Sequence, residues 1–456
     1  MVTQRPFEEL NLWQRIFADH WEAFATGYRR EHGEPVPEHW QENVERMLSC
    51  GDIREGYYEY FCPECGATKK VGFTCKSRLC LRCFKVAVDE WLEQARQVLF
   101  EGVIHRQVVL TVPKTIRPLL LADERFLKLY MDAGAKAVKE LVEEWRKKKK
   151  IRVGMMAVLQ LHGRSGNRNP HLHFVVSEGG IDKDRKWREV NYFDTKKLRK
   201  KWQYQVITAL RKAVLGTEYE GEWYNRLGAM FRLYPNGFDV DCMPETGPVE
   251  RLVRRILRIV YLCKYVSSPP ISIRRIESYD GQRVTYRYED HLKGPVMETI
   301  SAEEFIGRMI QHLPPKNFRM VRYYGIYARP VRQKLHDLVA VALKELVKRA
   351  EAVARYFGRK LGLSADGYRQ KVAERFGKGP VRCPECGSTK MLLVRIWSKT
   401  AGVLYDLRRD GLPQAMSGVS VLPALAASDS AVRPGTVADV RHEWRVARHE
   451  QMAFAI

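Results

Sequence analysis

The sequence contains no long hydrophobic run. None of its apolar stretches reaches the roughly 18 residues that a membrane-spanning helix needs. The first residues, MVTQRPFEELNLW, also lack the basic segment followed by an apolar segment that marks a secretory signal. We therefore expect a cytoplasmic protein that makes no use of a membrane.

Acidic side chains are outnumbered by basic ones. The chain has 54 Asp and Glu against 78 Lys and Arg, which gives a formal net charge of +24. This surplus favours nucleic acid as the partner, because basic side chains that neutralise phosphates release bound counterions. Solubility or an acidic protein partner is the simpler alternative. Because 45% of its 456 residues are hydrophobic, the chain can form several cores and is not a disordered protein.

Disulfide bonds are not expected, although the chain has ten cysteines. A cytosolic protein keeps its thiols reduced, and the cysteine spacing is typical of metal binding. The segment FCPECGATKKVGFTCKSRLCLRC contains two CxxC pairs, Cys62 with Cys65 and Cys80 with Cys83. Together these four thiolates can bind one tetrahedral Zn²⁺. The site is predicted to be structural, since four sulfur ligands leave no open position for catalysis.

The other cysteines allow more than one interpretation. Cys50 and Cys75 are either small buried hydrophobic residues or alternative zinc ligands. Cys383 and Cys386, in a second CPECG, form only half a site, so they are either a weak or shared zinc site or a remnant. Basic residues around the first module could make it a DNA-binding finger: Lys69, Lys70, Lys76, Arg78, Arg82 and Lys85.

Two histidines stand one residue apart in NRNPHLHFVVSEGG. Side chains alternate along a strand, so His171 and His173 should share one face while Leu172 points into the core. Such a pair is either half of a metal site or a chance occurrence.

One helix carries two tyrosines and a lysine on one face. In PVERLVRRILRIVYLCKYVSS, Tyr261 and Tyr265 are four residues apart, and Lys264 is three after Tyr261. Tyrosine is a weak nucleophile because its pKa is about 10. A metal ion and a cation can activate it by stabilising the phenolate and the phosphate that it attacks. Packing is the alternative role, since the chain has 21 tyrosines.

Periodicity predicts the remaining elements, and no internal repeat is present. Strands are expected at residues 105–113, 153–161 and 171–177, the last two as an antiparallel pair, and a hairpin is expected around Asp280-Gly281. Helices are expected at residues 7–30, 123–150, 248–268 and 331–377. The second of these should be apolar on one face, which carries Phe126, Tyr130, Ala133, Ala137, Leu141 and Trp145. After about residue 400 the chain is rich in Ala, Ser, Val and Pro, which is typical of a loosely ordered tail.

Over residues 45–330 the chain resembles the two-tyrosine HUH transposases of rolling-circle insertion sequences, of the IS91 type. The shared segments follow in order: the cysteine module, VVLTVPKTIRP, VLQLHG, NPHLHFVVSEGG, YLCKYVSSPPISIRRI, YRYEDH and EEFIGRMIQHLPPKNFRMVRYYG. The resemblance implies an α+β fold, in which a small zinc-binding module precedes an HUH-endonuclease antiparallel sheet with flanking helices. It also implies a prokaryotic, nucleoid-associated protein.

The resemblance implies that His171 and His173 bind one Mg²⁺ or Mn²⁺ with a third polar ligand. The family commonly has a histidine where this chain has Gln160, so either Gln160 or His162 completes the site. Tyr261 or Tyr265 would then attack single-stranded DNA.

That attack would give a 5′-phosphotyrosine link, with Lys264 contacting the phosphate. The DNA partners would be transposon ends and target sites, joined by rolling-circle transposition. Two alternatives stay open: a plasmid replication initiator or relaxase of the HUH type, and a non-catalytic zinc-finger DNA-binding protein.

Four segments are predicted along the chain. They are an N-terminal helix with the zinc-binding module (1–98), an HUH catalytic domain (99–330), a helical segment with the second CPECG (331–400) and the tail (401–456).

Overall fold

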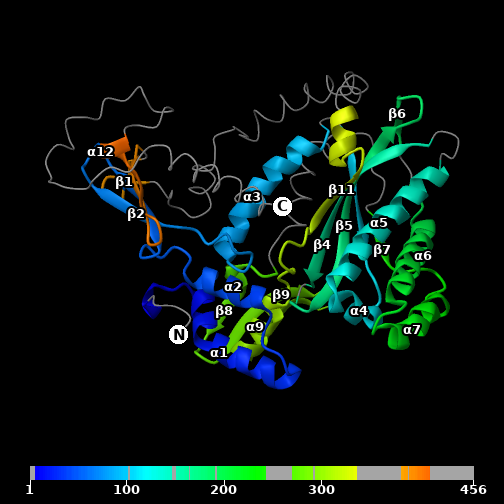
Figure 1. Cartoon of the computed structure of the whole chain (residues 1–456), viewed down its shortest axis with the longest axis horizontal. Helices are drawn as coiled ribbons and strands as arrows, with labels where there is room; N and C mark the ends of the chain where they lie inside the picture. Colours follow the sequence, from blue (N-terminus) through cyan, green and yellow to red (C-terminus); the bar gives the residue numbers. More distant parts are fainter. Residues whose placement is uncertain are drawn as a thin grey trace. The chain divides into compact units, whose positions relative to one another are not determined.

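The computed structural model describes most of the chain in two compact units (Figure 1). The described residues are 6–100, 103–145, 150–163, 165–190, 193–242, 270–290, 293–335, 382–388 and 390–410. The first unit contains the described residues up to Phe84 together with those after residue 381. The second unit contains the described residues from Lys85 to Leu335. Each unit is described separately below.

An antiparallel sheet of six strands forms the centre of the second unit. Its main order is β11-β4-β5-β3-β7, and β6 pairs with β5. The strands are β3 (His105–Leu110), β4 (Arg152–His162), β5 (Arg168–Ile181), β6 (Trp187–Glu189), β7 (Val240–Cys242) and β11 (Val321–Gly325). The predicted antiparallel pairing of the strands around residues 153–161 and 171–177 is confirmed by β4 and β5.

Helices cover both faces of this sheet. Figure 1 shows α3 on one side and α5, α6 and α7 on the other. The helices of the unit are α3 (Leu81–Val98, which begins in the first unit), α4 (Arg117–Ala122), α5 (Glu124–Trp145), α6 (Thr195–Val214) and α7 (Glu220–Leu233), with the short 3₁₀ helix η2 (Lys114–Ile116) before α4.

Alternation along β5 assigns its side chains to the two faces. Leu172 and Phe174 are fully buried in the large core against α5 and α6, whereas Val175 packs with Trp91 of α3. A Cβ added to Gly134 of α5 would lie 2.8 Å from Leu172 Cδ1, so this glycine lets the helix approach the sheet closely. The predicted apolar face of α5 is confirmed at its described positions: Phe126, Tyr130, Ala133, Ala137 and Leu141 are buried.

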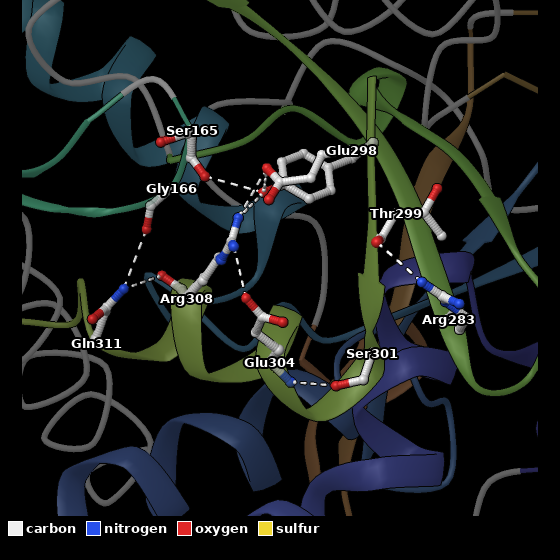
Figure 2. Close-up of polar contacts among 10 residues, drawn as sticks. Ser165, Gly166, Arg283, Glu298, Thr299, Ser301, Glu304, Arg308 and Gln311 are labelled. Atoms are coloured by element: carbon white, nitrogen blue, oxygen red, sulfur yellow. Dashed lines mark hydrogen bonds and ion pairs between the residues drawn. The ribbon is translucent and has the colours of Figure 1, made fainter. Parts of the chain in front are cut away.

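A smaller sheet follows in the second unit, after the short 3₁₀ helix η3 (Ile273–Arg275). Its order is β10-β9-β8, all antiparallel, with β8 at Ile276–Tyr279, β9 at Arg283–Asp290 and β10 at Gly294–Ser301. The predicted hairpin at Asp280-Gly281 is confirmed, because Gly281 adopts a φ of 99° between β8 and β9. Helix α9 (Ala302–Ile310) comes next, and Ser301 caps it by accepting a hydrogen bond from the Glu304 backbone N–H (Figure 2).

The first unit combines two helices with a four-stranded sheet. After η1 (Phe7–Glu9), α1 (Leu12–His32) begins at a capping box formed by Asn11 and Gln14. Its buried face packs with α2 (Glu38–Leu48), which supplies Val44 and Leu48 to the core. The sheet has the order β13-β12-β1-β2, with β1 at Gly56–Phe61, β2 at Thr68–Gly72, β12 at Leu392–Ser398 and β13 at Gly402–Asp406; α12 (Leu407–Asp410) follows.

The C-terminal part of this sheet differs from the prediction. A helical segment was expected up to residue 400 and a loose tail after it, but residues 392–398 and 402–406 form antiparallel strands. β12 pairs with β1, and such long-range pairing leaves no local sequence signal. The predicted helix at residues 248–268, nearly all of the one at 331–377, and the tail after residue 410 lie outside the described residues. No helix among the described residues is long and apolar enough to cross a membrane.

Candidate active site and metal centres

The two histidines lie side by side on β5, which is a central strand of the six-stranded sheet. The ring centroids of His171 and His173 are 4.8 Å apart, while Leu172 between them is buried on the opposite face. The face with the histidines is the one that α3 covers further along β5. The predicted alternation of these three residues is therefore confirmed.

Two glutamine side chains contact the ring of His173. Gln160 Oε1 lies 3.1 Å from His173 Nε2, and Gln107 Nε2 lies 3.1 Å from His173 Nδ1. Gln160 is directly opposite His171 in the pairing of β4 with β5, so it shares the face of the two histidines. The side chains of Gln107, Gln160 and His173 are all buried, which leaves little freedom for the His173 ring to rotate.

The hydrogen bond of His171 determines which of its ring nitrogens is available. His171 Nδ1 lies 2.7 Å from the backbone oxygen of Asn169, so Nδ1 must carry the hydrogen and donate it. In the neutral ring Nε2 then keeps its lone pair, which is the form that binds a metal.

Burial keeps both rings neutral. It is the main cause that lowers the pKa of His173 to about 3, with further contributions from His171 and His162. Burial also lowers the pKa of His171. Neither ring has to lose a proton before it binds a cation near pH 7.

His162, the alternative third ligand, is the last residue of β4 and follows a register shift after Gln160. Its ring is 5.4 Å from the ring of His312, and it is paired with Arg168 rather than with His171. Within the described residues, the groups of three or more His, Cys, Asp or Glu side chains close enough to share an ion are two cysteine clusters. Gln160, whose Oε1 lies 3.1 Å from His173 Nε2, is a candidate third ligand on this geometry.

The cysteines form two clusters of four, both in the first unit. One contains Cys50, Cys75, Cys80 and Cys83, and the other contains Cys62, Cys65, Cys383 and Cys386. The Sγ atoms that contact one another within the clusters are 3.4–3.7 Å apart. Four sulfurs around one tetrahedral zinc, each at about 2.3 Å, would be about 3.8 Å apart, so both clusters fit this metal.

The predicted grouping of Cys62, Cys65, Cys80 and Cys83 around one zinc is wrong. Cys62 and Cys65 lie at the tip of the β1–β2 hairpin, whereas Gly51 N bonds to Phe73 O at its base. Strands of five or six residues separate these two ends by roughly 17 Å, which no single ion can bridge. Cys80 and Cys83 therefore pair with Cys50 and Cys75 at the base, and the alternative ligand role of the last two is favoured.

Two family models match the chain. One, described as a transposase zinc-binding domain, matches residues 16–112, and the other, described as a putative transposase, matches residues 154–334. The chain is 29% identical to a transposase for insertion sequence element IS801 from Pseudomonas savastanoi pv. phaseolicola, over 66% of this chain and 74% of the relative. It is 24% identical to the putative transposase y4qJ from Sinorhizobium fredii, over 84% of this chain and 96% of the relative.

The chain belongs to the IS91-type transposases. As a transposase it acts on DNA, and its N-terminal domain is a zinc-binding domain. No solved structure gives a significant match.

Each of the two matched regions contains one kind of site: cysteines in the first, and the histidine pair in the second. The zinc-binding match includes the whole cluster at the hairpin base but only half of the cluster at its tip, because Cys383 and Cys386 lie outside both matches. The second match includes Gln160, His171 and His173. Tyr261, Lys264 and Tyr265 fall within it too, but they lie outside the described residues.

The turn that joins β4 to β5 is held by residues that the sequence analysis did not single out. Gln311 Nε2 donates to Gly166 O at 3.2 Å (Figure 2). His312 Nε2 donates to the same oxygen at 2.8 Å. Tyr286 Oη lies 3.1 Å from Ser165 O. These contacts hold the turn from α9 and β9, immediately before the strand with the two histidines.

Arg308 completes this arrangement. It donates to Tyr286 Oη at 2.6 Å. It also forms ion pairs with Glu298 at 3.0 Å and Glu304 at 2.6 Å (Figure 2). The only sequence signal for Tyr286, Arg308, Gln311 and His312 was their place within segments shared with the transposase family. Gln107 was likewise missed, because a lone glutamine on a strand resembles any other polar position.

Proposed function

We propose that this transposase nicks and rejoins single-stranded DNA through an HUH mechanism, and thereby moves its insertion sequence by rolling-circle transposition. The observation that carries the proposal is the neutral pair His171 and His173 on a central strand, with Gln160 in contact with the second ring.

The donor set fits one Mg²⁺ or Mn²⁺. His171 offers Nε2, and Gln160 offers Oε1 next to His173 Nε2. Such an ion would polarise the scissile phosphate and orient it for in-line attack. Because Mg²⁺ prefers oxygen ligands, phosphate oxygens and water would supply the rest of its shell.

Gln107 is the residue that would orient His173 for this role. When its amide nitrogen donates to Nδ1, the hydrogen of a neutral ring lies on Nε2. Rotation of the amide by 180° presents its oxygen to Nδ1–H instead and leaves the lone pair on Nε2, toward Gln160. The two orientations have nearly the same shape, so metal binding would select the second.

The nucleophile would be Tyr261 or Tyr265. Its phenolic oxygen attacks the phosphorus, a tyrosine–phosphate bond forms, and the bond from phosphorus to the 3′ oxygen breaks. The phenolic proton is lost and the leaving oxygen takes up a proton, which gives a 5′-phosphotyrosine and a free 3′-OH. Lys264 would stabilise the phosphate charge. Attack by a 3′-OH on this link rejoins the strand without ATP.

Covalent trapping of an oligonucleotide from the insertion-sequence end tests the proposal. We expect Tyr261→Phe to abolish the first covalent adduct, because it removes the nucleophilic hydroxyl and little else. Tyr265→Phe should keep first cleavage and fail in the second strand transfer. Mass spectrometry of the digested adduct identifies the tyrosine, and Tyr204→Phe, at an exposed tyrosine of α6, is the matched control.

The same assay tests the metal pair. His173→Ala should lower Mg²⁺-dependent nicking by at least 100-fold and leave the zinc content unchanged, while His32→Ala, at an exposed position near the end of α1, should nick normally. Normal nicking by His173→Ala, or an adduct on neither tyrosine, would rule out the HUH mechanism.

A further inference from the structure

We propose that Cys62, Cys65, Cys383 and Cys386 form a zinc site of their own, so that the full chain binds two structural zinc ions. The inference rests on the geometry of the first unit and is independent of the HUH mechanism. Two of the ligands lie outside both regions that match known families. We call this group the tip cluster, and the group Cys50, Cys75, Cys80 and Cys83 the base cluster.

The two CPECG segments fold into the same turn. In the first, Gly66 N bonds to Cys62 O at 2.9 Å and Cys62 N bonds to Ala67 O at 2.8 Å. In the second, Gly387 N bonds to Cys383 O at 3.2 Å and Cys383 N bonds to Ser388 O at 2.8 Å.

Both glycines adopt the left-handed conformation that this turn requires, with φ values of 78° and 74°. The second segment therefore keeps the backbone geometry of a metal-binding knuckle, and the interpretation of it as a remnant is disfavoured.

The two turns face each other because their strands are paired. β1 ends at Phe61, which is opposite Leu392 at the start of β12, so the residues just after β1 and those just before β12 come together. The Sγ atoms of Cys62 and Cys386 are 3.6 Å apart, and those of Cys65 and Cys383 are 3.4 Å apart. Each contact joins one turn to the other, and each distance is far longer than a disulfide bond of about 2.05 Å.

Other side chains also link the two turns where they meet, which we call the junction. Cys62 and Cys383 are buried together with Met391, and Tyr60 packs against them. Lys390 forms an ion pair with Glu64 at 3.1 Å, which links the second turn to the first. Lys69 Nζ donates to Arg382 O at 3.2 Å. The junction is thus built around the four sulfurs, as a closed four-thiolate zinc site requires.

The site would join parts of the chain that are far apart in sequence. Cys65 and Cys383 are separated by 318 positions, and the described residues of the second unit lie between them in sequence. Zinc binding energy at such a site is folding energy, so the metal would hold β12 and β13 onto the front hairpin. Without the metal, the pairing of β12 with β1 would be less stable.

The experiment is zinc stoichiometry of the full chain by elemental analysis. We expect two zinc ions per chain in the wild type and one in Cys383→Ser/Cys386→Ser. Cys75→Ser/Cys83→Ser should also retain one, through the tip cluster. Cys242→Ser is the matched control and should keep both, since Cys242 belongs to neither cluster.

Two further measurements on the wild type remain decisive if a variant does not fold. X-ray absorption should show four sulfur ligands at about 2.3 Å for every zinc. Cobalt substitution should give two equivalents of tetrahedral thiolate sites. One zinc per wild-type chain, or two zinc ions retained by a folded Cys383→Ser/Cys386→Ser variant, would overturn the proposal. Neither outcome depends on DNA cleavage.

Discussion

His312 is a buried side chain whose neutral ring makes the protein sensitive to acid. Burial is the main cause that lowers its pKa to about 3, followed by the effects of His162 and Arg168. In an unfolded chain the same ring titrates near the ordinary histidine pKa of about 6.5. Above pH 6.5 both states are neutral, so His312 leaves stability unchanged there. Below it the unfolded state binds a proton that the folded state excludes until about pH 3.

The prediction at this residue is a smaller loss of stability in acid for His312→Gln. Between pH 7 and pH 5 the wild type should lose about 2 kcal/mol of unfolding free energy through His312. Glutamine keeps an N–H group but cannot be protonated, so the loss should be smaller by about that amount. Denaturant unfolding at both pH values measures it, with His32→Gln as the exposed control. Equal losses in wild type and His312→Gln would contradict the neutral burial of this ring.

At the scale of elements, the β4–β5 turn is the connection on which the histidine strand depends. The Tyr286 hydroxyl donates to the carbonyl oxygen of Ser165 in this turn, and Arg308 of α9 donates to the same hydroxyl. We expect Tyr286→Phe to lower the free energy of unfolding by about 1 kcal/mol, because it removes the hydroxyl that donates to the Ser165 carbonyl. The more specific expectation is a higher Mg²⁺ concentration for half-maximal nicking, with the zinc content unchanged.

Hydrogen exchange in the turn should rise in Tyr286→Phe and stay unchanged in Tyr288→Phe, its matched control on the same strand. If exchange rises while the Mg²⁺ requirement does not change, the turn stabilises the fold without positioning the histidines.

The elements also show where sequence reasoning succeeds. Alternation along β5 correctly assigned Leu172 to the core and the two histidines to the other face. Helical periodicity correctly assigned Phe126 and Tyr130 to the buried face of α5. Both signals are local, since each depends on how a strand or helix presents successive side chains.

Sequence reasoning failed where the structure depends on distant pairing. The CxxC spacing correctly indicated zinc ligands, but the spacing alone could not show that a hairpin separates Cys62 from Cys80. The partner of Cys62 lies just before β12, more than 300 positions away, as the 324-residue separation from Cys386 shows. Gln107 was equally hard to group, because only strand register brings it to His173, whereas Gln160 was a candidate ligand through the family resemblance alone. The tyrosine face remains a prediction.

At the scale of the whole molecule, the net charge of +24 is the property that most affects DNA binding. A chain that neutralises phosphates releases counterions, so its affinity falls as the salt concentration rises. The slope for single strands is about −0.7 per phosphate contacted, so five contacts would give about a 100-fold loss between 50 and 200 mM salt. Fluorescence anisotropy of a labelled single-stranded oligonucleotide measures this slope, at constant Mg²⁺.

The control separates charge from the catalytic site. His173→Ala should bind with the wild-type salt slope, because it removes no cationic side chain: burial keeps the His173 ring neutral by lowering its pKa to about 3. An affinity that hardly changes with salt would mean that the basic surplus serves solubility or an acidic protein partner instead. A steep slope together with lost nicking in His173→Ala would assign affinity to the charge of the whole chain and chemistry to the strand β5.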